Sequence, residues 1–127
     1  MGLKIFATGG TFDKIYDEYN GTLTFTETHL SEMLKIARCG LDADIETIIL
    51  MYSLDMREKH RQLISLKCKE CLEDRIVITH GTDTVIETAS VIAQEHYDKT
   101  IVLTGAIIPY YDNVRKNKAI NQFETIK

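Results

Sequence analysis

The sequence has 127 residues, of which 44% are hydrophobic and 27% are charged, a balance typical of one globular domain that excludes extended disorder. Its net charge of −4, from 15 basic and 19 acidic residues, argues against a protein that binds nucleic acid through the phosphates. No apolar run approaches the roughly 20 residues of a membrane span, and residues 1–7 are too short and mixed for a signal peptide. We therefore expect a cytoplasmic protein that acts on a small-molecule substrate, with no nucleic-acid or membrane partner.

Strand and helix patterns alternate along the chain. Short apolar runs predict strands, and apolar residues at helical spacing predict helices. The predicted strands are 3–7, 22–25, 45–51, 75–79 and 100–104, and the predicted helices run from Thr28 to before Gly40 and over 57–72, 83–96 and 113–127. This alternation predicts an α/β fold, an open, mostly parallel doubly wound sheet of Rossmann-like type with flanking helices. No linker, repeat or change in composition marks a boundary, so we expect one domain over residues 1–127.

Two of these helices have an apolar stripe that predicts their buried face. The expected inward residues are Ile64, Cys68, Cys71 and Leu72 in the first, and Val85, Ala89, Ile92 and Ala93 in the second. Cys68 and Cys71 also have the spacing of a zinc or redox pair, but no second pair exists to complete four ligands. Buried helix cysteines are the better interpretation, and we expect no metal site.

Each main strand runs directly into a small polar or glycine-rich turn. The turns are Thr8-Gly9-Gly10-Thr11, Ser53-Leu54-Asp55, Thr79-His80-Gly81-Thr82-Asp83-Thr84 and Thr104-Gly105-Ala106. Taken singly, the first is a tight turn without the spacing of a dinucleotide site, and the third is explained by a helix cap, with His80 as a structural residue beneath it. In an open parallel sheet, however, such turns gather at the carboxyl ends of the strands, where ligands bind. Together they predict a binding site at this edge.

Three of these segments resemble the bacterial-type L-asparaginase family: Ala7 to Thr11, Ile78 to Thr84 followed by Glu87-Thr88-Ala89, and Val102 to Ala106. The segment Ser53 to Met56 looks like the family's substrate-binding loop, and Phe12 to Tyr16 resembles its short, single-domain branch. The resemblance implies an enzyme that hydrolyses asparagine, and glutamine more slowly, to the acid and ammonia through a covalent acyl-enzyme on threonine. It implies no cofactor or metal, and it leaves a homo-oligomer open.

By this resemblance, Thr11 is the nucleophile and Tyr16 helps to activate its hydroxyl. A threonine hydroxyl is a weak nucleophile at its free pKa, so a neighbour of this kind is a chemical necessity. Thr82, Asp83 and Lys116 match the family's second polar triad, in which the lysine relays or stabilises a proton.

The substrate contacts follow from the same resemblance. Asp83 matches the carboxylate that receives the α-ammonium group, and Ser53 matches a donor to the α-carboxylate. The full set of expected substrate-binding residues is Gly10, Ser53, Gly81, Thr82, Asp83 and Ala106.

The sequence departs from the family pattern after the fourth turn. Only residues 107–113 stand where the family has a loop, a helix and a strand, which need more than ten residues. We therefore expect that a segment near 111–113 is missing, by deletion or omission, and that Lys116 is placed less securely than Thr11. Leu54 stands where longer members commonly carry glutamine. Two-domain members also supply a glutamate from a partner subunit's C-terminal domain, and we expect this chain to lack such a domain.

These departures keep two alternatives open. One is a catalytically impaired amino-acid-binding module of the same fold. The other, the asparaginase-like subunit of a transfer-RNA amidotransferase, is disfavoured by the acidic net charge.

Overall fold

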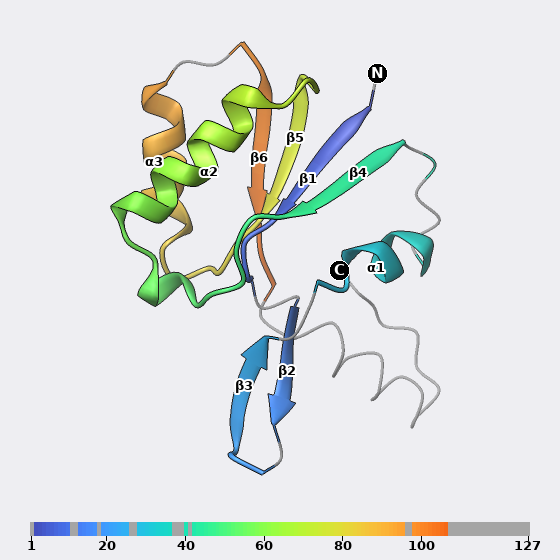
Figure 1. The fold of residues 1–127 in the computed structure, drawn as a ribbon, viewed down its shortest axis with the longest axis vertical. Coiled ribbons are helices and arrows are strands. Elements are labelled where there is room, and N and C mark those ends of the chain that lie inside the picture. Colours follow the sequence, from blue (N-terminus) through green and yellow to red (C-terminus); the bar gives the residue numbers. More distant parts are fainter. Residues whose placement is uncertain are drawn as a thin grey trace.

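The described part of the chain forms a parallel sheet with helices on both faces and a separate two-stranded hairpin (Figure 1). The structure, a computed structural model, describes residues 2–10, 13–17, 19–25, 28–36, 40, 42–95 and 98–106, without the side chains of residues 16, 17, 23 and 24. Its elements are β1 (Leu3–Ala7), β2 (Lys14–Asp17), β3 (Thr22–Phe25), α1 (Leu30–Ile36), β4 (Ala43–Thr47), α2 (Glu58–Glu70), β5 (Arg75–Thr79), α3 (Val85–Gln94) and β6 (Thr100–Thr104). The predicted helix 113–127 and the expected join near 111–113 lie outside the described residues.

The sheet has the strand order β4-β1-β5-β6, and every neighbouring pair is parallel. The first strand of the chain, β1, therefore lies inside the sheet. Its neighbour on one side is β4, and β5 followed by β6 lies on the other side. This topology confirms the predicted open, doubly wound α/β fold, and it brings the carboxyl ends of all four strands to one edge.

The two faces of β1 bury different helices. Phe6 packs in a cluster with Ile64 of α2 and Ile92 of α3, whereas Ile5 packs with Leu30 of α1 on the opposite face. Because successive side chains of a strand point to opposite faces, this alternation sandwiches the sheet between α1 and the α2–α3 pair (Figure 1).

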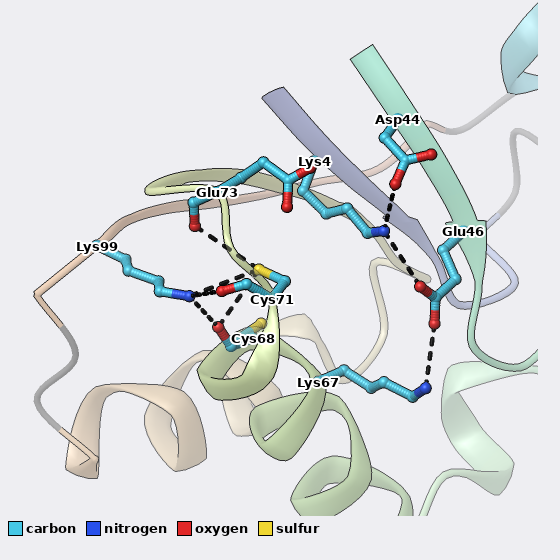
Figure 2. Close-up of polar contacts among 8 residues, drawn as sticks. All are labelled: Lys4, Asp44, Glu46, Lys67, Cys68, Cys71, Glu73 and Lys99. Carbon is cyan, nitrogen blue, oxygen red and sulfur yellow. Dashed lines mark hydrogen bonds and ion pairs between the residues drawn. The ribbon is translucent and has the colours of Figure 1, made fainter. Parts of the chain in front are cut away.

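A chain of ion pairs crosses the amino end of the sheet (Figure 2). The Lys4 Nζ lies 2.6 Å from Asp44 Oδ2 and 3.2 Å from Glu46 Oε1, and the Lys67 Nζ of α2 lies 3.1 Å from Glu46 Oε2. The hydrogen bond to Asp44 raises the pKa of Lys4, and the one from Lys67 lowers the pKa of Glu46. Lys4 and Glu46 are therefore charged at neutral pH, and the four side chains satisfy one another.

Lys99 closes the end of α2 at the same end of the sheet (Figure 2). Its Nζ donates to the carbonyl of Cys68 at 2.8 Å and to that of Cys71 at 2.5 Å. The last carbonyls of a helix have no partner within the helix and favour a cation, so this lysine stabilises the helix terminus. Burial raises the pKa of the Cys68 thiol to about 12, which makes it unreactive and agrees with a structural cysteine.

Several predicted boundaries were wrong. The strand expected at 45–51 runs from Ala43 to Thr47, because its register follows the five residues of β1. The helix expected over 57–72 ends at Glu70, and extended backbone at Cys71 leaves Leu72 96% exposed instead of buried. In α3 the expected Ala93 is exposed, and Thr88 is buried.

The strand predicted at 22–25 is confirmed as β3, but its partner β2 was not predicted. The predicted helix after Thr28 is confirmed as α1, and the Thr28 hydroxyl accepts a hydrogen bond from the backbone N–H of Leu30 at 3.3 Å.

Candidate active site

The turns that follow the four sheet strands contact one another at the carboxyl edge. A Cβ placed on Gly10 would lie 2.7 Å from the carbonyl oxygen of His80, and one placed on Gly105 would lie 2.6 Å from the same oxygen. A Cβ on Gly81 would lie 2.6 Å from the Ser53 Oγ. Side chains essentially never approach so closely, so glycine is required where these turns cross. The predicted gathering of turns at this edge is present.

The first turn is fixed by its backbone. Gly9 has a φ of 97°, a conformation that favours glycine, and a Cβ there would overlap the backbone of Met51. The N–H and the hydroxyl of Thr8 both donate to the carbonyl of Thr79, at 3.2 and 2.6 Å. The backbone that follows β1 is therefore held in one conformation at Thr8 and Gly9.

Ser53 presents a buried hydroxyl with no hydrogen-bond partner among the described residues. The residue is 3% exposed, begins a 3₁₀ turn over Ser53–Asp55 and lies beside Gly81. Its carbonyl accepts a hydrogen bond from the Thr84 hydroxyl at 2.9 Å, which ties this turn to the one after β5. An unsatisfied buried hydroxyl costs free energy, so Ser53 is held ready for a polar ligand.

Thr82 and Asp83 are exposed in the turn between β5 and α3. Within the described part of the chain, neither side chain has a hydrogen-bond partner. The N-cap residue of α3 is Thr84, and it makes no side-chain cap bond, because its hydroxyl goes to Ser53. The polar run therefore does more than cap a helix, and it leaves a carboxylate and a hydroxyl available to a ligand.

A buried hydrogen-bond chain supports this turn from beneath. The His80 Nδ1 lies 2.7 Å from the carbonyl of Gly81, which can only accept, so the proton is on Nδ1. The Nε2 then accepts from the Thr88 hydroxyl at 2.7 Å, and that oxygen accepts from the Arg61 Nε at 3.2 Å. Burial lowers the pKa of His80 and keeps it neutral, in agreement with the structural role predicted for it.

Asp13 is a second supporting residue, to which the sequence analysis assigned no role. Its carboxylate is fully buried and accepts hydrogen bonds from the His29 N–H at 2.8 Å and from the Thr28 hydroxyl at 3.0 Å. Its own N–H donates to the carbonyl of Gly10 at 3.0 Å. Burial raises the pKa of Asp13 against these hydrogen bonds. The residue thus joins the first turn to the start of α1.

The predicted site residues divide into those that the structure describes and those that it does not. At the carboxyl edge it places Gly10, Ser53, Gly81, Thr82, Asp83 and Ala106. Thr11 and Lys116 lie outside the described residues. The backbone of Tyr16 belongs to β2, opposite Leu23, and its side chain is not described.

In the described ranges, no three His, Cys, Asp or Glu residues gather in a way that could hold a metal ion. No helix within those ranges is long and apolar enough to cross a membrane.

Residues 2–126 match a protein family described as "Asparaginase, N-terminal". Among solved structures, the thermostable L-asparaginase from Thermococcus kodakarensis is similar, with a TM-score of 0.73 and 27% identity over 87% of this chain. L-asparaginase I from Vibrio cholerae gives 0.74 and 25% over 86%, and the probable cytoplasmic L-asparaginase from Campylobacter jejuni gives 0.66 and 29% over 85%. In each case the match covers 35% of the other chain. A search among curated proteins found no significant match.

Proposed function

Since this chain belongs to the asparaginase family, whose N-terminal domain it matches over residues 2–126, we propose that it hydrolyses the side-chain amide of L-asparagine. The products are aspartate and ammonia, and glutamine is the slower substrate. The observation that carries the proposal is the Ser53 hydroxyl, which is buried, unpartnered among the described residues and set where turns from different strands meet. A ligand with a carboxylate would satisfy it.

The proposed substrate contacts use both charges of an amino acid. Asp83 is exposed and has no partner within the described chain, so its carboxylate is available to the α-ammonium group. Ser53 and the backbone at Gly10 and Gly81 face the α-carboxylate. Thr82 and the carbonyl of Ala106 contact the side-chain amide of the substrate. The scissile bond then lies beside the exposed Thr82 hydroxyl.

The proposed reaction passes through an acyl-enzyme on Thr11. The Thr11 hydroxyl attacks the amide carbon and loses its proton to the base that Tyr16 provides. The base returns this proton to the amide nitrogen, the tetrahedral intermediate expels ammonia and leaves an ester on Thr11, and water then hydrolyses the ester. Backbone N–H groups in the turns stabilise the oxyanion, an interaction typically worth about 10²–10³ in rate. Thr82, Asp83 and Lys116 form the second triad, in which the lysine stabilises or relays a proton.

The rest of the proposal concerns the protein as a whole. It acts in the cytoplasm without a cofactor or metal ion, on a small molecule and not on nucleic acid or membranes, and a homo-oligomer is compatible with it. A segment near 111–113 is missing from the sequence relative to the family, and the intact mass of the purified protein tests this point.

Ammonia release from asparagine and from glutamine is the direct test. We expect turnover in the wild type and a loss of more than about 10³-fold in Thr11→Ala, because that variant lacks the nucleophile. Thr82→Val should show a similar loss, since it keeps the shape of the residue but not the hydroxyl. Thr100→Ala is the matched control, because this exposed threonine begins β6 at the opposite end of the sheet. Full activity in Thr11→Ala would remove its role as nucleophile.

One observation favours a second function, an amino-acid-binding module without effective catalysis. Leu54 is 74% exposed and offers an apolar side chain where longer family members carry glutamine. Titration calorimetry with asparagine, combined with the ammonia assay, separates the two functions. A binding module binds asparagine but releases no ammonia, whereas the enzyme does both.

A further inference from the structure

Thr84 is the N-cap residue of α3, but its side chain serves another segment. Its carbonyl accepts a hydrogen bond from the N–H of Thr88 at 3.3 Å, which begins the helix. A threonine at this position normally also accepts a hydrogen bond from one of the next N–H groups of its helix. Thr84 makes no such bond, and its hydroxyl instead donates to the carbonyl of Ser53 at 2.9 Å. The side chain therefore omits a stabilising cap and holds the 3₁₀ turn Ser53–Asp55.

The Ser53 carbonyl also accepts a hydrogen bond from within its own turn. The N–H of Met56 donates to it at 3.1 Å and closes the 3₁₀ turn. A carbonyl oxygen has two lone pairs, so these two donors complete its hydrogen bonding. One donor belongs to the turn itself, and the other, Thr84, stands 31 residues further along the chain. The backbone of Ser53 is thereby fixed relative to the start of α3.

The side chain of Ser53 is confined as well as its backbone. It is buried, and a Cβ placed on Gly81 would lie 2.8 Å from the Ser53 Cβ and 2.6 Å from its Oγ. The serine side chain therefore fills the space that glycine leaves at position 81. Its hydroxyl has no hydrogen-bond partner among the described residues, so its hydrogen-bonding capacity is left for a ligand.

We propose that Thr84 is a positioning residue that preorganises the Ser53 hydroxyl for the α-carboxylate of an amino acid. This inference rests on the substrate contact of Ser53 in the proposed function. A local rule of helix capping is broken at Thr84 without a gain to the helix, and such departures are expected at functional sites. Without the Thr84 hydroxyl, the 3₁₀ turn populates further arrangements, and the affinity falls with the fraction that is competent to bind. The loss falls on binding, because Ser53 contacts the α-carboxylate and not the reacting amide.

The test measures the binding of L-aspartate by titration calorimetry and the steady-state hydrolysis of asparagine. L-aspartate is the product of the proposed reaction, so it keeps both α groups and is not consumed. Thr84→Val keeps the shape of the side chain without its hydroxyl. It should weaken aspartate binding and raise KM about three- to tenfold, with kcat within about twofold of the wild type.

Two variants serve as controls for Thr84→Val. Thr84→Ser keeps the hydroxyl and should bind aspartate within about twofold of the wild-type affinity. Thr100→Val makes the same chemical change in an exposed threonine at the other end of the sheet, and it should bind as the wild type does. A loss of affinity in Thr84→Ser as large as that in Thr84→Val would show that the hydroxyl is not the group that matters.

A double-mutant cycle shows whether Thr84 acts through Ser53. Ser53→Ala removes the ligand contact itself, so it should weaken aspartate binding at least as much as Thr84→Val does. Adding Thr84→Val to Ser53→Ala should then change the affinity by less than about twofold, because the group that Thr84 positions is already gone. If the two losses multiply instead, Thr84 acts on the ligand by another route and the positioning role is wrong.

The remaining outcomes separate the positioning role from the proposed function. Wild-type affinity in Thr84→Val would overturn the positioning role, even with a loss of stability in urea, since a purely structural hydrogen bond gives that combination. A fall in kcat with unchanged affinity would overturn it as well. Aspartate binding without ammonia release in the wild type would refute the proposed hydrolysis alone, and the affinities of the variants would still decide the role of Thr84. A wild type that neither binds aspartate nor releases ammonia overturns both.

Discussion

The amino and carboxyl ends of the sheet differ in whether their polar side chains are paired. At the amino end, Lys4 is paired with Asp44 and Glu46, and Lys99 is bonded to the helix carbonyls, so each charge already has its partner. At the carboxyl end, the Ser53 hydroxyl is buried without a partner within the described chain. The backbone there is held by glycine crossings and by the side-chain hydrogen bonds of Thr8 and Thr84, not by charge pairs. The comparison shows that the Ser53 hydroxyl stays available because other groups fix the backbone around it.

The largest effect is expected where the backbone of the carboxyl edge is fixed. Gly9→Ala places a Cβ on backbone with a φ of 97° and against Met51, so the free energy of unfolding should fall by about 3 kcal/mol or more. Urea denaturation measures this loss. Gly40→Ala is the matched control, because a Cβ there meets nothing within 4 Å, and it should change stability by less than about 0.5 kcal/mol. An unaffected Gly9→Ala would show that the first turn can move.

The next effect concerns the buried support of the third turn. Thr88→Val keeps the shape of the side chain but leaves the His80 Nε2 and the Arg61 Nε without this partner, which should cost about 1–3 kcal/mol. Thr100→Val, at the exposed start of β6, should be nearly neutral by the same urea measurement. Equal effects of the two substitutions would mean that the hydrogen-bond chain contributes no stability.

A smaller effect is expected from the titration of His80. Because burial and the nearby Arg61 lower its pKa in the folded protein, the unfolded chain takes up the proton first as the pH falls. The stability that neutral His80 provides is therefore complete above the ordinary histidine pKa, near 6.5, and is lost as the pH drops below it toward the folded value. Urea unfolding at about pH 7.5 and about pH 6 should show this decrease, and His80→Gln should flatten it. A wild-type stability that rises over this range on acidification would contradict the assignment.

The smallest effect is expected at the amino edge. Lys4→Met keeps the length of the side chain and removes only the charge, while Asp44 and Glu46 remain open to water at 66% and 39% exposure. The free energy of unfolding should change by less than about 1 kcal/mol, and its dependence on salt should weaken. A loss as large as that of Gly9→Ala would erase the contrast between the edges.

Much of the fold was readable from the sequence because the central strands carry their own signals. The strands at 3–7, 75–79 and 100–104 were predicted to the residue, since each is a buried apolar run closed by a polar or glycine turn. By contrast, Lys14 to Asp17 has no such pattern and is a strand only through its pairing with β3. Leu72 was wrongly predicted to be buried in the helix, because the spacing of apolar residues does not show where a helix ends and the backbone becomes extended.

The location of the site could be predicted from the sequence, but the contacts that support it could not. Parallel topology alone brings the four turns together, so the neighbourhood of Ser53 and Gly81 followed from strand order. The bonds of Asp13 to Thr28 and His29, and the contact of Phe25 with Tyr52, join positions distant in sequence, and no local pattern encodes them. For the contacts of Asp13, the sequence signal that could have indicated them is an aspartate near a glycine turn together with a Thr-His pair before the next helix. The catalytic roles of Thr11 and Lys116 stay predictions.

The glycine crossings also decide how this edge can change over evolution. Where Gly81 meets Ser53 and Gly10 meets His80, one turn cannot shift without displacing its neighbour, so these positions tolerate almost no substitution. Leu54 and Thr82 point outward from the same interlocked backbone and can be replaced without moving it. A substitution of Leu54, which is 74% exposed, can therefore change the side chain presented at this edge while the backbone stays in place.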